Sequence, residues 1–413
     1  MPSASARPEL DDLLGEEAIN DPHGFFARLR EYDPVYWNER WNGWIVTRYD
    51  DVVEGFRDHD RLSSDRFAGP FGEEWRADEL SDGYETLLKF LSGFLVWKDP
   101  PYHKRVRALV SQAFTATSVD SLRPRIEGLT AELAEPLRGR ERVDFLSEFA
   151  FHLPVVVICE FIGVPSQARE DIKRWSDDLG GVIFVRDDDD DRLGRAERAV
   201  QSLVDFLRPI IAQRRREPRE DLLSAMLGAE ERGDFLSEDE VIGNLILMVF
   251  AGHETTMNLM ANGVVAFNDH PDEWRRLQRE PQLARSAVEE MLRYDGPIRA
   301  MARWAKTSFE WHGREIAQYD RVLLHQAAAN RDPAAFAHAE RMDIGRRPNR
   351  HVGFGYGIHN CLGGPLARLE TLSAFSWFAR ELDRIEVIEP ERRYHPTIVS
   401  RSLRKLHVRF HER

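Results

Sequence analysis

Residues 354–363 read Phe354-Gly355-Tyr356-Gly357-Ile358-His359-Asn360-Cys361-Leu362-Gly363, a single cysteine framed by glycines. An isolated cysteine is most often a small buried apolar residue. The spacing favours another interpretation, a metal-bound thiolate, because such a sulfur needs backbone N–H donors around it to spread its charge. Glycines allow the backbone to fold tightly around a sulfur, and we expect Gly363 to let the next segment approach closely. Phe354 can shield the sulfur from water.

This stretch resembles the haem-binding signature of the cytochrome P450 family, Phe-Gly-x-Gly-x-His-x-Cys-x-Gly, with every fixed position present. The resemblance implies that Cys361 is the axial thiolate ligand of haem b, the cofactor that we expect. The other cysteine, Cys159, ends an apolar run over residues 153–159, and we interpret it as a core residue. Two cysteines do not make a disulfide framework.

Composition limits the class of protein. The chain has 413 residues, of which 42% are hydrophobic and 10% aromatic, enough for a sizeable core. No apolar run approaches the roughly 18–20 residues that span a membrane, and the first residues lack the apolar core of a signal peptide. The formal net charge of −14 argues against bulk affinity for nucleic acid. We therefore expect a soluble, cytoplasmic protein, a monomer that binds neither membranes nor nucleic acid.

Apolar periodicity predicts a mainly α-helical chain with small β-sheets. The predicted strands are residues 35–37, 43–48, 310–314 and 321–324, with an extended segment over 395–410. The predicted helices are residues 101–115, 119–136, 167–180, 192–215, 237–268, 272–279 and 283–294. We expect one catalytic domain over residues 1–413 with the cytochrome P450 fold, a helical body at about 101–294 and a β-rich portion that joins both ends.

The helix predicted over residues 237–268 begins with a capping box, Ser237-x-x-Glu240, and carries Ala251-Gly252-His253-Glu254-Thr255-Thr256 at its middle. The threonine hydroxyls can bond the backbone carbonyl one turn back, and Gly252 lowers the cost of opening the helix there. One interpretation is that these polar groups are simply satisfied inside a long helix. The other is chemical, because Ala-Gly-x-Glu-Thr resembles the oxygen-activation motif of the family. That resemblance implies that Glu254 and Thr255 organise water and deliver protons during cleavage of O₂.

Further motifs occur in the family's order. Glu290 and Arg293 match Glu-x-x-Arg, and their i, i+3 spacing puts both on one helix face, as in many surface ion pairs. The resemblance implies that they meet Arg341 and brace the core, a structural role. His103, Arg107, Arg303 and His359 match the family's propionate contacts, although each alone is more often a surface residue.

The resemblance implies a monooxygenase that inserts one oxygen atom from O₂ into a small organic molecule. A haem-thiolate peroxygenase and a non-catalytic haem sensor or ligand carrier are the alternatives. The chain carries no flavin or iron–sulfur extension, so we expect electrons from an acidic ferredoxin-type donor with its NAD(P)H reductase. Basic residues that flank the motifs would attract that donor; they are Lys104, Arg105, Arg346, Arg347, Arg350 and Arg368.

The resemblance places four segments over the open side of the haem: residues 67–94, residues 179–184, the middle of the central helix, and the segments after Glu-x-x-Arg and near the end. Gly180 and Gly181 would be hinges of a lid over residues 179–184. The predicted pocket residues are Leu247, Phe250, Ala251, Ile298, Met301, Ile398 and Val399. These apolar walls favour a mostly apolar substrate. Arg299 would select an anionic group if it faced the pocket. The run Asp187 to Asp191 is interpreted as a solvated loop, with a Ca²⁺ site as the alternative.

Overall fold

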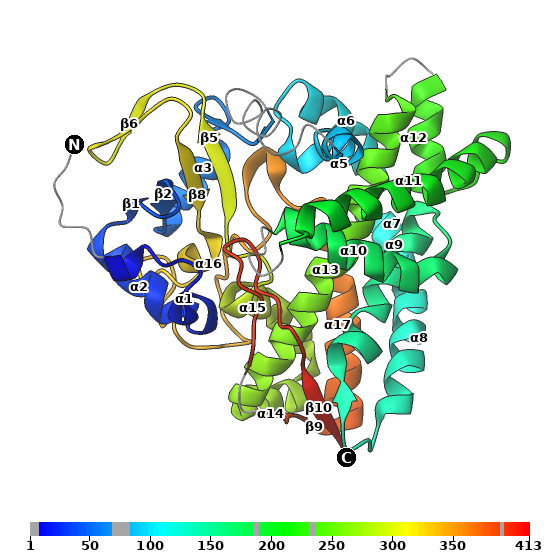
Figure 1. Ribbon diagram of the computed structural model, residues 1–413. Helices are drawn as coiled ribbons and strands as arrows, with labels where there is room; N and C mark the ends of the chain where they lie inside the picture. Colours follow the sequence, from blue (N-terminus) through cyan, green and yellow to red (C-terminus); the bar gives the residue numbers. More distant parts are fainter. Residues whose placement is uncertain (1–7, 68–82, 185–189, 232–235, 389–391) are drawn as a thin grey trace.

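A helical body and a smaller β-rich part lie side by side in the computed structural model (Figure 1). The structure describes residues 8–67, 83–184, 190–231, 236–388 and 392–413. The helices of the body are α5 (Glu85–Leu91), α6 (Tyr102–Ser111), α7 (Ala116–Ser121), α8 (Arg123–Ala134), α9 (His152–Ile162), α10 (Arg169–Ile183), α11 (Arg192–Arg216), α12 (Leu222–Glu231), α13 (Glu238–Asp269), α14 (Pro271–Arg279), α15 (Ala284–Asp295) and α17 (Gly364–Glu381). The expected fold class, mainly α with small sheets, is confirmed.

The β-rich part joins segments that are far apart in sequence. Its sheet has the strand order β1-β2-β8-β5-β3, in which only β2 and β8 are parallel. These strands are β1 (Val35–Asn38), β2 (Gly43–Val46), β3 (Leu62–Ser63), β5 (Met301–Ala305) and β8 (Arg321–Leu324). The helices around it are α1 (Glu16–Asn20), α2 (Pro22–Tyr32), α3 (Tyr49–Arg57) and α16 (Gln326–Ala329). Apolar side chains of α2 and α3 pack in the two clusters that cover the sheet.

Two smaller sheets complete the fold. The predicted strand over 310–314 is a hairpin of β6 (Phe309–Trp311) and β7 (Arg314–Ile316), turned at residues with positive φ, His312 and Gly313. The other sheet has the order β4-β10-β9, from β4 (Val143–Asp144), β9 (Leu382–Val387) and β10 (His407–Glu412). The expected extended segment over 395–410 is a strand only from His407, and the residues before it make single bridges.

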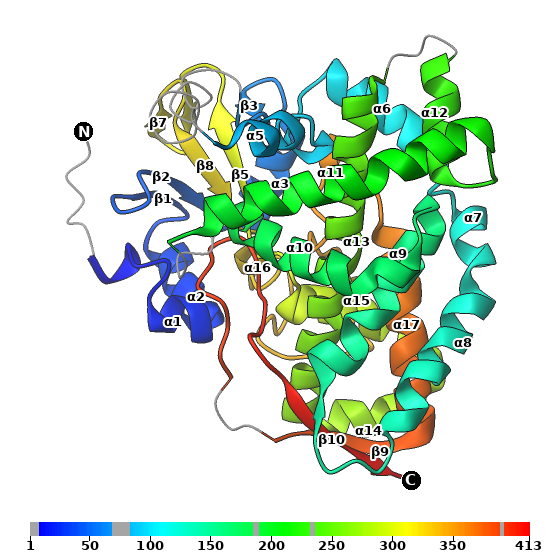
Figure 2. The same ribbon diagram turned by 45° about the vertical axis from the view of Figure 1, so that its right-hand side comes forward.

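The central helix α13 runs through the helical body, and α10 and α11 cross it in Figure 2. Its predicted capping box is present, because Ser237 Oγ accepts from Glu240 N at 3.2 Å and Glu240 Oε2 accepts from Ser237 N at 2.6 Å. At 1.5 Å per residue, the 32 residues span roughly 48 Å. The helix is continuous past Gly252, where a Cβ atom would lie 2.6 Å from Ile158 Cγ1. This glycine therefore allows α13 to pack closely on α9, and the expectation that it opens the helix was wrong.

Several helices were not predicted: α1, α2, α3, α5 and α16 around the sheet and the site, and α9, α12 and α17 in the body. The helix predicted over 101–115 ends at Ser111, and the one predicted over 119–136 begins at Arg123 after the separate α7. Cys159 is fully buried in α9, as its interpretation as a core residue requires. Within the described ranges, no helix is both long and apolar enough to cross a bilayer.

Candidate functional site

The loop that precedes α17 wraps around Cys361. Gly355 and Gly357 have φ of 69° and 70°, values that side chains rarely adopt. A Cβ atom on Gly357 would also lie 2.6 Å from the carbonyl oxygen of Phe56 on α3. The Cys361 N–H donates to the Phe354 carbonyl at 2.9 Å, which closes the loop on itself. The backbone conformation of the loop thus explains why two positions of the sequence motif are glycine.

Backbone donors surround the Cys361 sulfur, as the sequence predicts. The N–H groups of Gly363 and Gly364 bond to it at the start of α17, where a helix presents unpaired donors and the positive end of its dipole. A Cβ atom on Gly363 would meet no other atom within 4 Å, so the expected close approach of another segment is wrong.

The two cysteines differ in the charges and hydrogen-bond donors that surround the sulfur. Burial raises the pKa of the Cys361 thiol, while the two glycine N–H groups and the charges of Arg107 and Arg368 act to lower it. Cys361 is nevertheless exposed to solvent, although protein surrounds its sulfur densely enough to raise the pKa. Burial, with the charge of Glu160, raises the pKa of Cys159 to about 12. Of the two cysteines, Cys361 is the one with backbone donors and positive charges beside its sulfur, the groups that stabilise a thiolate.

Four predicted propionate contacts come together near this loop. The rings of His103 and His359 lie 4.2 Å apart, and neither Nε2 atom has a hydrogen-bond partner. Arg107 on α6 donates to the carbonyl of Asn360 at 2.5 Å. Arg303 is 4% exposed, lies over the Phe56 ring and donates to a neighbouring carbonyl. Sequence reasoning therefore grouped four residues that the fold also groups.

Asp99 is the carboxylate whose charge reaches this group, and it already binds Lys306 at 3.2 Å and Ser63 at 2.6 Å. Burial lowers the pKa of His359 to about 2, with contributions from the charges of Arg303, His103 and Arg107. Burial, with Arg107, lowers the pKa of His103 to about 4. Burial lowers the pKa of Arg303 to about 10. Two guanidinium groups and two unpartnered ring nitrogens fit the two carboxylates of a haem, because carboxylate oxygens accept from such donors.

The middle of α13 presents one accessible stripe in an otherwise buried helix. Leu247, Ala251 and Thr255 are partly exposed, and their i, i+4, i+8 spacing places them on one face. The Thr255 hydroxyl donates to the carbonyl of Ala251 at 2.8 Å. Glu254 is buried beside this stripe, where its Oε1 accepts from Asn258 Nδ2 at 3.3 Å. Asn258 was missed by sequence reasoning, although its i+4 distance from Glu254 could have identified it.

The other predicted pocket residues lie in separate places. Ile298 bridges to Ser400, and the N–H of Arg299 donates to the carbonyl of Val399 at 2.7 Å. The segment before β5 and the segment after residue 392 therefore lie side by side. Phe250 is buried and its ring lies 5.3 Å from that of Phe184. Ile398 packs on the cluster that contains Ala300, whereas Met301 packs on the cluster that contains Phe56.

Arg341 does not join Glu290 and Arg293. Its side chain is 73% exposed and lies near Glu340. The third member is Arg346, whose Nε lies 3.2 Å from Glu290, and both side chains are buried. Arg293 donates to both carboxylate oxygens of Glu290 at 2.8 Å and to the carbonyl of Arg341. Arg341 contributes its backbone alone, so the predicted residue was wrong and the predicted network is present.

Arg299 does not face a substrate pocket as an unpaired cation. It is 2% exposed, and it donates to the carbonyls of Thr397 and Ala18. Its guanidinium also lies over the Phe26 ring, 5.6 Å from the centroid. The backbone acceptors come from both ends of the chain, so Arg299 fastens these ends to the sheet.

Several expectations concern the segments around the site. Gly180 and Gly181 are buried in the last turns of α10, and their role as hinges of a lid stays a prediction. Most of the segment over 67–94 and of the run Asp187 to Asp191 lies outside the described residues. Within the described ranges, no three His, Cys, Asp or Glu side chains gather as a metal site.

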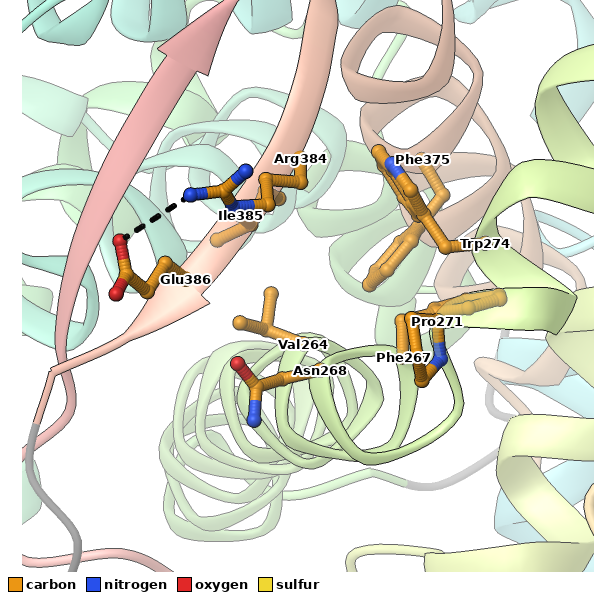
Figure 3. Close-up of a pocket in the computed structure, with 9 residues that line it drawn as sticks. All are labelled: Val264, Phe267, Asn268, Pro271, Trp274, Phe375, Arg384, Ile385 and Glu386. Atoms are coloured by element: carbon orange, nitrogen blue, oxygen red, sulfur yellow. Dashed lines mark ion pairs between the residues drawn. The ribbon is translucent and has the colours of Figure 1, made fainter.

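A small pocket of about 120 Å³ lies elsewhere, at the end of α13 (Figure 3). Its walls include Phe267, Trp274 and Phe375, and the Arg384–Glu386 ion pair at 3.9 Å lies along one side. None of the predicted site residues lines it. It is a gap between α13, α14, α17 and β9, and it is separate from the site around Cys361.

Comparison with known proteins gives consistent matches. The family model "Cytochrome P450" matches residues 189–397. The chain is 38% identical to vitamin D(3) 25-hydroxylase of Pseudonocardia autotrophica, over 88% of this chain and 86% of that protein. It is 37% identical to 6-deoxyerythronolide B hydroxylase of Saccharopolyspora erythraea, over 87% and 88%. The crystal structure of myxobacterial CYP267B1 in complex with myristic acid superimposes with a TM-score of 0.88 at 36% identity, covering 99% of this chain and all of that one.

Proposed function

The chain belongs to the cytochrome P450 family and is a haem-thiolate monooxygenase, and on that premise we propose which of its residues perform the reaction. Cys361 is the thiolate ligand of haem b. The observation that carries this assignment is the pair of N–H groups from Gly363 and Gly364 on its sulfur. When bound, the haem supplies the activation of O₂ with two electrons, and the thiolate tunes it.

Glu254 and Thr255 deliver protons at the site. The Thr255 hydroxyl lies on the accessible stripe of α13, where it can donate to a bound water or to the reacting oxygen. It can exchange its bond to the Ala251 carbonyl for such a contact, since that carbonyl already lies within a helix. Glu254 holds a proton one residue away, and Asn258 fixes the position of its carboxyl group. This pair connects the buried helix with the space above it.

Propionate binding falls to His103, Arg107, Arg303 and His359, whose unsatisfied donors support this role. The apolar residues Leu247, Phe250, Ala251, Ile298, Ile398 and Val399 line the substrate space. Met301 leaves β5 on the same face as Arg303, so it lies closer to the propionate side. The substrate is a mostly apolar organic molecule that the enzyme hydroxylates, since apolar walls favour such ligands by desolvation.

A separate ferredoxin-type protein, reduced by an NAD(P)H reductase, supplies the electrons. Arg105 binds Glu240, Arg346 binds Glu290 and Arg368 binds Glu289, so these three expected docking charges are already neutralised. Lys104, Arg347 and Arg350 are exposed and make no ion pair within the described chain. The docking surface is therefore smaller than the sequence predicts. An open groove of about 580 Å³ between α7, α15 and α17 borders Arg368.

The described chain works as one catalytic unit, and its expected cytoplasmic location stays a prediction.

The test of the function is substrate-dependent oxidation of NADPH by the haem-loaded protein with a surrogate ferredoxin and reductase. A monooxygenase consumes nearly one NADPH and one O₂ for each molecule of hydroxylated product that it forms. A peroxygenase would form product with peroxide alone, and a sensor or carrier would bind ligand without forming product under either condition. Either result would contradict the proposal.

A further inference from the structure

Arg66 is a guanidinium without an acceptor among the residues that the structure describes. It follows β3 by three residues, and it lies 4.1 Å from the ring centroid of Trp97 and 5.9 Å from that of Trp304. The neighbouring acid, Asp65, is bound to Lys98 at 2.9 Å. A guanidinium has five N–H donors, and within the described ranges those of Arg66 have neither a carboxylate nor a carbonyl to bind.

Three buried arginines of this chain have acceptors for their guanidinium groups. Arg293 binds Glu290, Arg401 binds Asp295 and Arg299 binds two carbonyls. Protein surrounds Arg66 densely enough for burial to lower its pKa to about 10. Part of the side chain is nevertheless accessible. Arg66 is therefore partly accessible within dense protein surroundings, and a charge in such a place favours an anion as its partner.

Strand geometry indicates on which side of the sheet this space lies. Arg303 and Trp304 are consecutive in β5, so their side chains leave opposite faces. Arg303 points toward Phe56 and the histidine pair. Trp304 leaves the face opposite to Arg303, and Trp97, the other ring beside Arg66, packs in the apolar cluster that contains Phe250 and contacts Ile298 and Val399. Arg66 thus lies on the side that we assign to the substrate, away from the propionate group.

We propose that Arg66 binds the carboxylate of the substrate, which makes the substrate an apolar organic acid. This inference rests on the proposed function and specifies its substrate class. The guanidinium would donate two parallel hydrogen bonds to the carboxylate. The rings of Trp97 and Trp304 hold its plane and exclude water. The anion-selecting role that the sequence suggests for Arg299 falls to Arg66, because the guanidinium of Arg299 already binds two carbonyls.

The test is a binding titration of the haem-loaded, full-length protein, read by the spin-state shift of the haem and by equilibrium dialysis. The probes are two matched pairs, dodecanoic acid with methyl dodecanoate and 4-cyclohexylbenzoic acid with its methyl ester. Wild-type protein should bind at least one acid roughly 10- to 100-fold more tightly than its ester, the range of a charge-assisted hydrogen bond. Arg66→Gln should remove this preference by weakening the acid alone, and Arg66→Lys should keep part of it. Arg28→Gln is the matched control, an arginine over the ring of Phe25 on α2.

Equal affinity for acids and esters in wild-type protein, no binding of either acid, or an unchanged preference in Arg66→Gln would overturn the proposal. A haem propionate is the other source of a carboxylate. In that case Arg66→Gln would weaken acid and ester alike and speed the transfer of haem to excess apomyoglobin. The titration needs no turnover, so a failure here is distinct from a failure of the monooxygenase assignment, which the NADPH measurement detects.

Discussion

Glu254 and Thr255 are neighbours in sequence and occupy different surroundings in α13. Thr255 lies on the accessible stripe with Leu247 and Ala251, whereas Glu254 is buried and held by Asn258. Successive helix residues point about 100° apart, a consequence of 3.6 residues per turn. We therefore expect the proton to pass from the buried carboxyl group of Glu254 to the Thr255 hydroxyl at the edge of the open space.

Thr255→Ala should leave substrate binding within about twofold and divert most electrons from NADPH to peroxide or water, because the hydroxyl that guides the proton is lost. Thr256→Ala is the matched control. Its hydroxyl makes the same bond one turn back, to Gly252 at 3.2 Å, and the residue is buried. The measurement is product formed per NADPH consumed. Equal coupling in both variants would show that Thr255 does not lie at the reacting oxygen.

At the scale of elements, the contact between α15 and the loop at 341–349 depends on one carboxylate. Glu290 accepts from Arg293, Arg346, Asn349 and the backbone N–H of Asp343. Such a network is costly to break, because removal of a partner leaves a buried charge unbalanced. It holds the chain that leads from α16 to the cysteine loop.

Arg346→Gln should lower the free energy of unfolding by about 3 kcal/mol, whereas Arg341→Gln should change it by less than about 0.5 kcal/mol, since its side chain is exposed. Urea unfolding followed by circular dichroism measures both. The opposite ranking of the two variants would restore Arg341 to the network and contradict the assignment to Arg346.

Local patterns predicted some elements better than others. The start of α13 could be located because its capping box is a short sequence signal. The helix α9 was missed because it is apolar on all sides, so it has no polar face to give a period. The choice between Arg341 and Arg346 could not be made from sequence, since it depends on the path of a loop whose spacing matches no regular structure. The Cys361 loop could be recognised from sequence because its glycines, histidine and cysteine all lie within ten residues.

At the scale of the whole molecule, contacts between distant segments decide the roles of several charged residues. Arg299 binds carbonyls of Ala18 and Thr397. Arg401 binds Asp295 and the carbonyl of Ile19. No sequence pattern predicts these acceptors, because they are backbone carbonyl groups from segments near both ends of the chain. The acids that pair with Arg105 and Arg368 are also distant in sequence, so the sequence analysis expected both arginines to be available for a partner.

Association with an acidic electron donor should depend on few charges. Arg347→Glu should slow reduction by the donor roughly tenfold at low salt, and the difference should shrink as salt screens the charge. Arg105→Gln should have a smaller effect, since Glu240 already neutralises Arg105. Stopped-flow reduction at several ionic strengths measures both rates. Rates that ignore salt and the charge reversal would contradict this docking surface.

Two buried histidines should make stability depend on pH. Burial lowers the pKa of His253 to about 4 and lowers that of His325 well below its ordinary value, helped by the charge of Arg299. The folded state keeps both neutral, while the unfolded chain protonates them below about pH 6.5. Stability is therefore full above pH 6.5 and falls as the pH decreases toward 4.

Urea unfolding at pH 7.5 and 5.0 tests this dependence, and the midpoint should be lower at pH 5.0. His253→Gln should remove one proton from the pH dependence of unfolding. The slope of the free energy of unfolding against pH should then fall by about 1.4 kcal/mol per pH unit below the unfolded pKa. Identical midpoints in wild-type protein at the two pH values would be inconsistent with two neutral, buried histidines.

The thiolate assignment is tested most directly by the absorption spectrum of the reduced carbonyl complex. Wild-type protein and Cys159→Ser should both show the band of a thiolate-bound haem, because Cys159 lies buried in α9 with its pKa raised to about 12. Cys361→His should retain some haem and lose that band. A thiolate band that survives in Cys361→His, or that disappears in Cys159→Ser, would contradict the account.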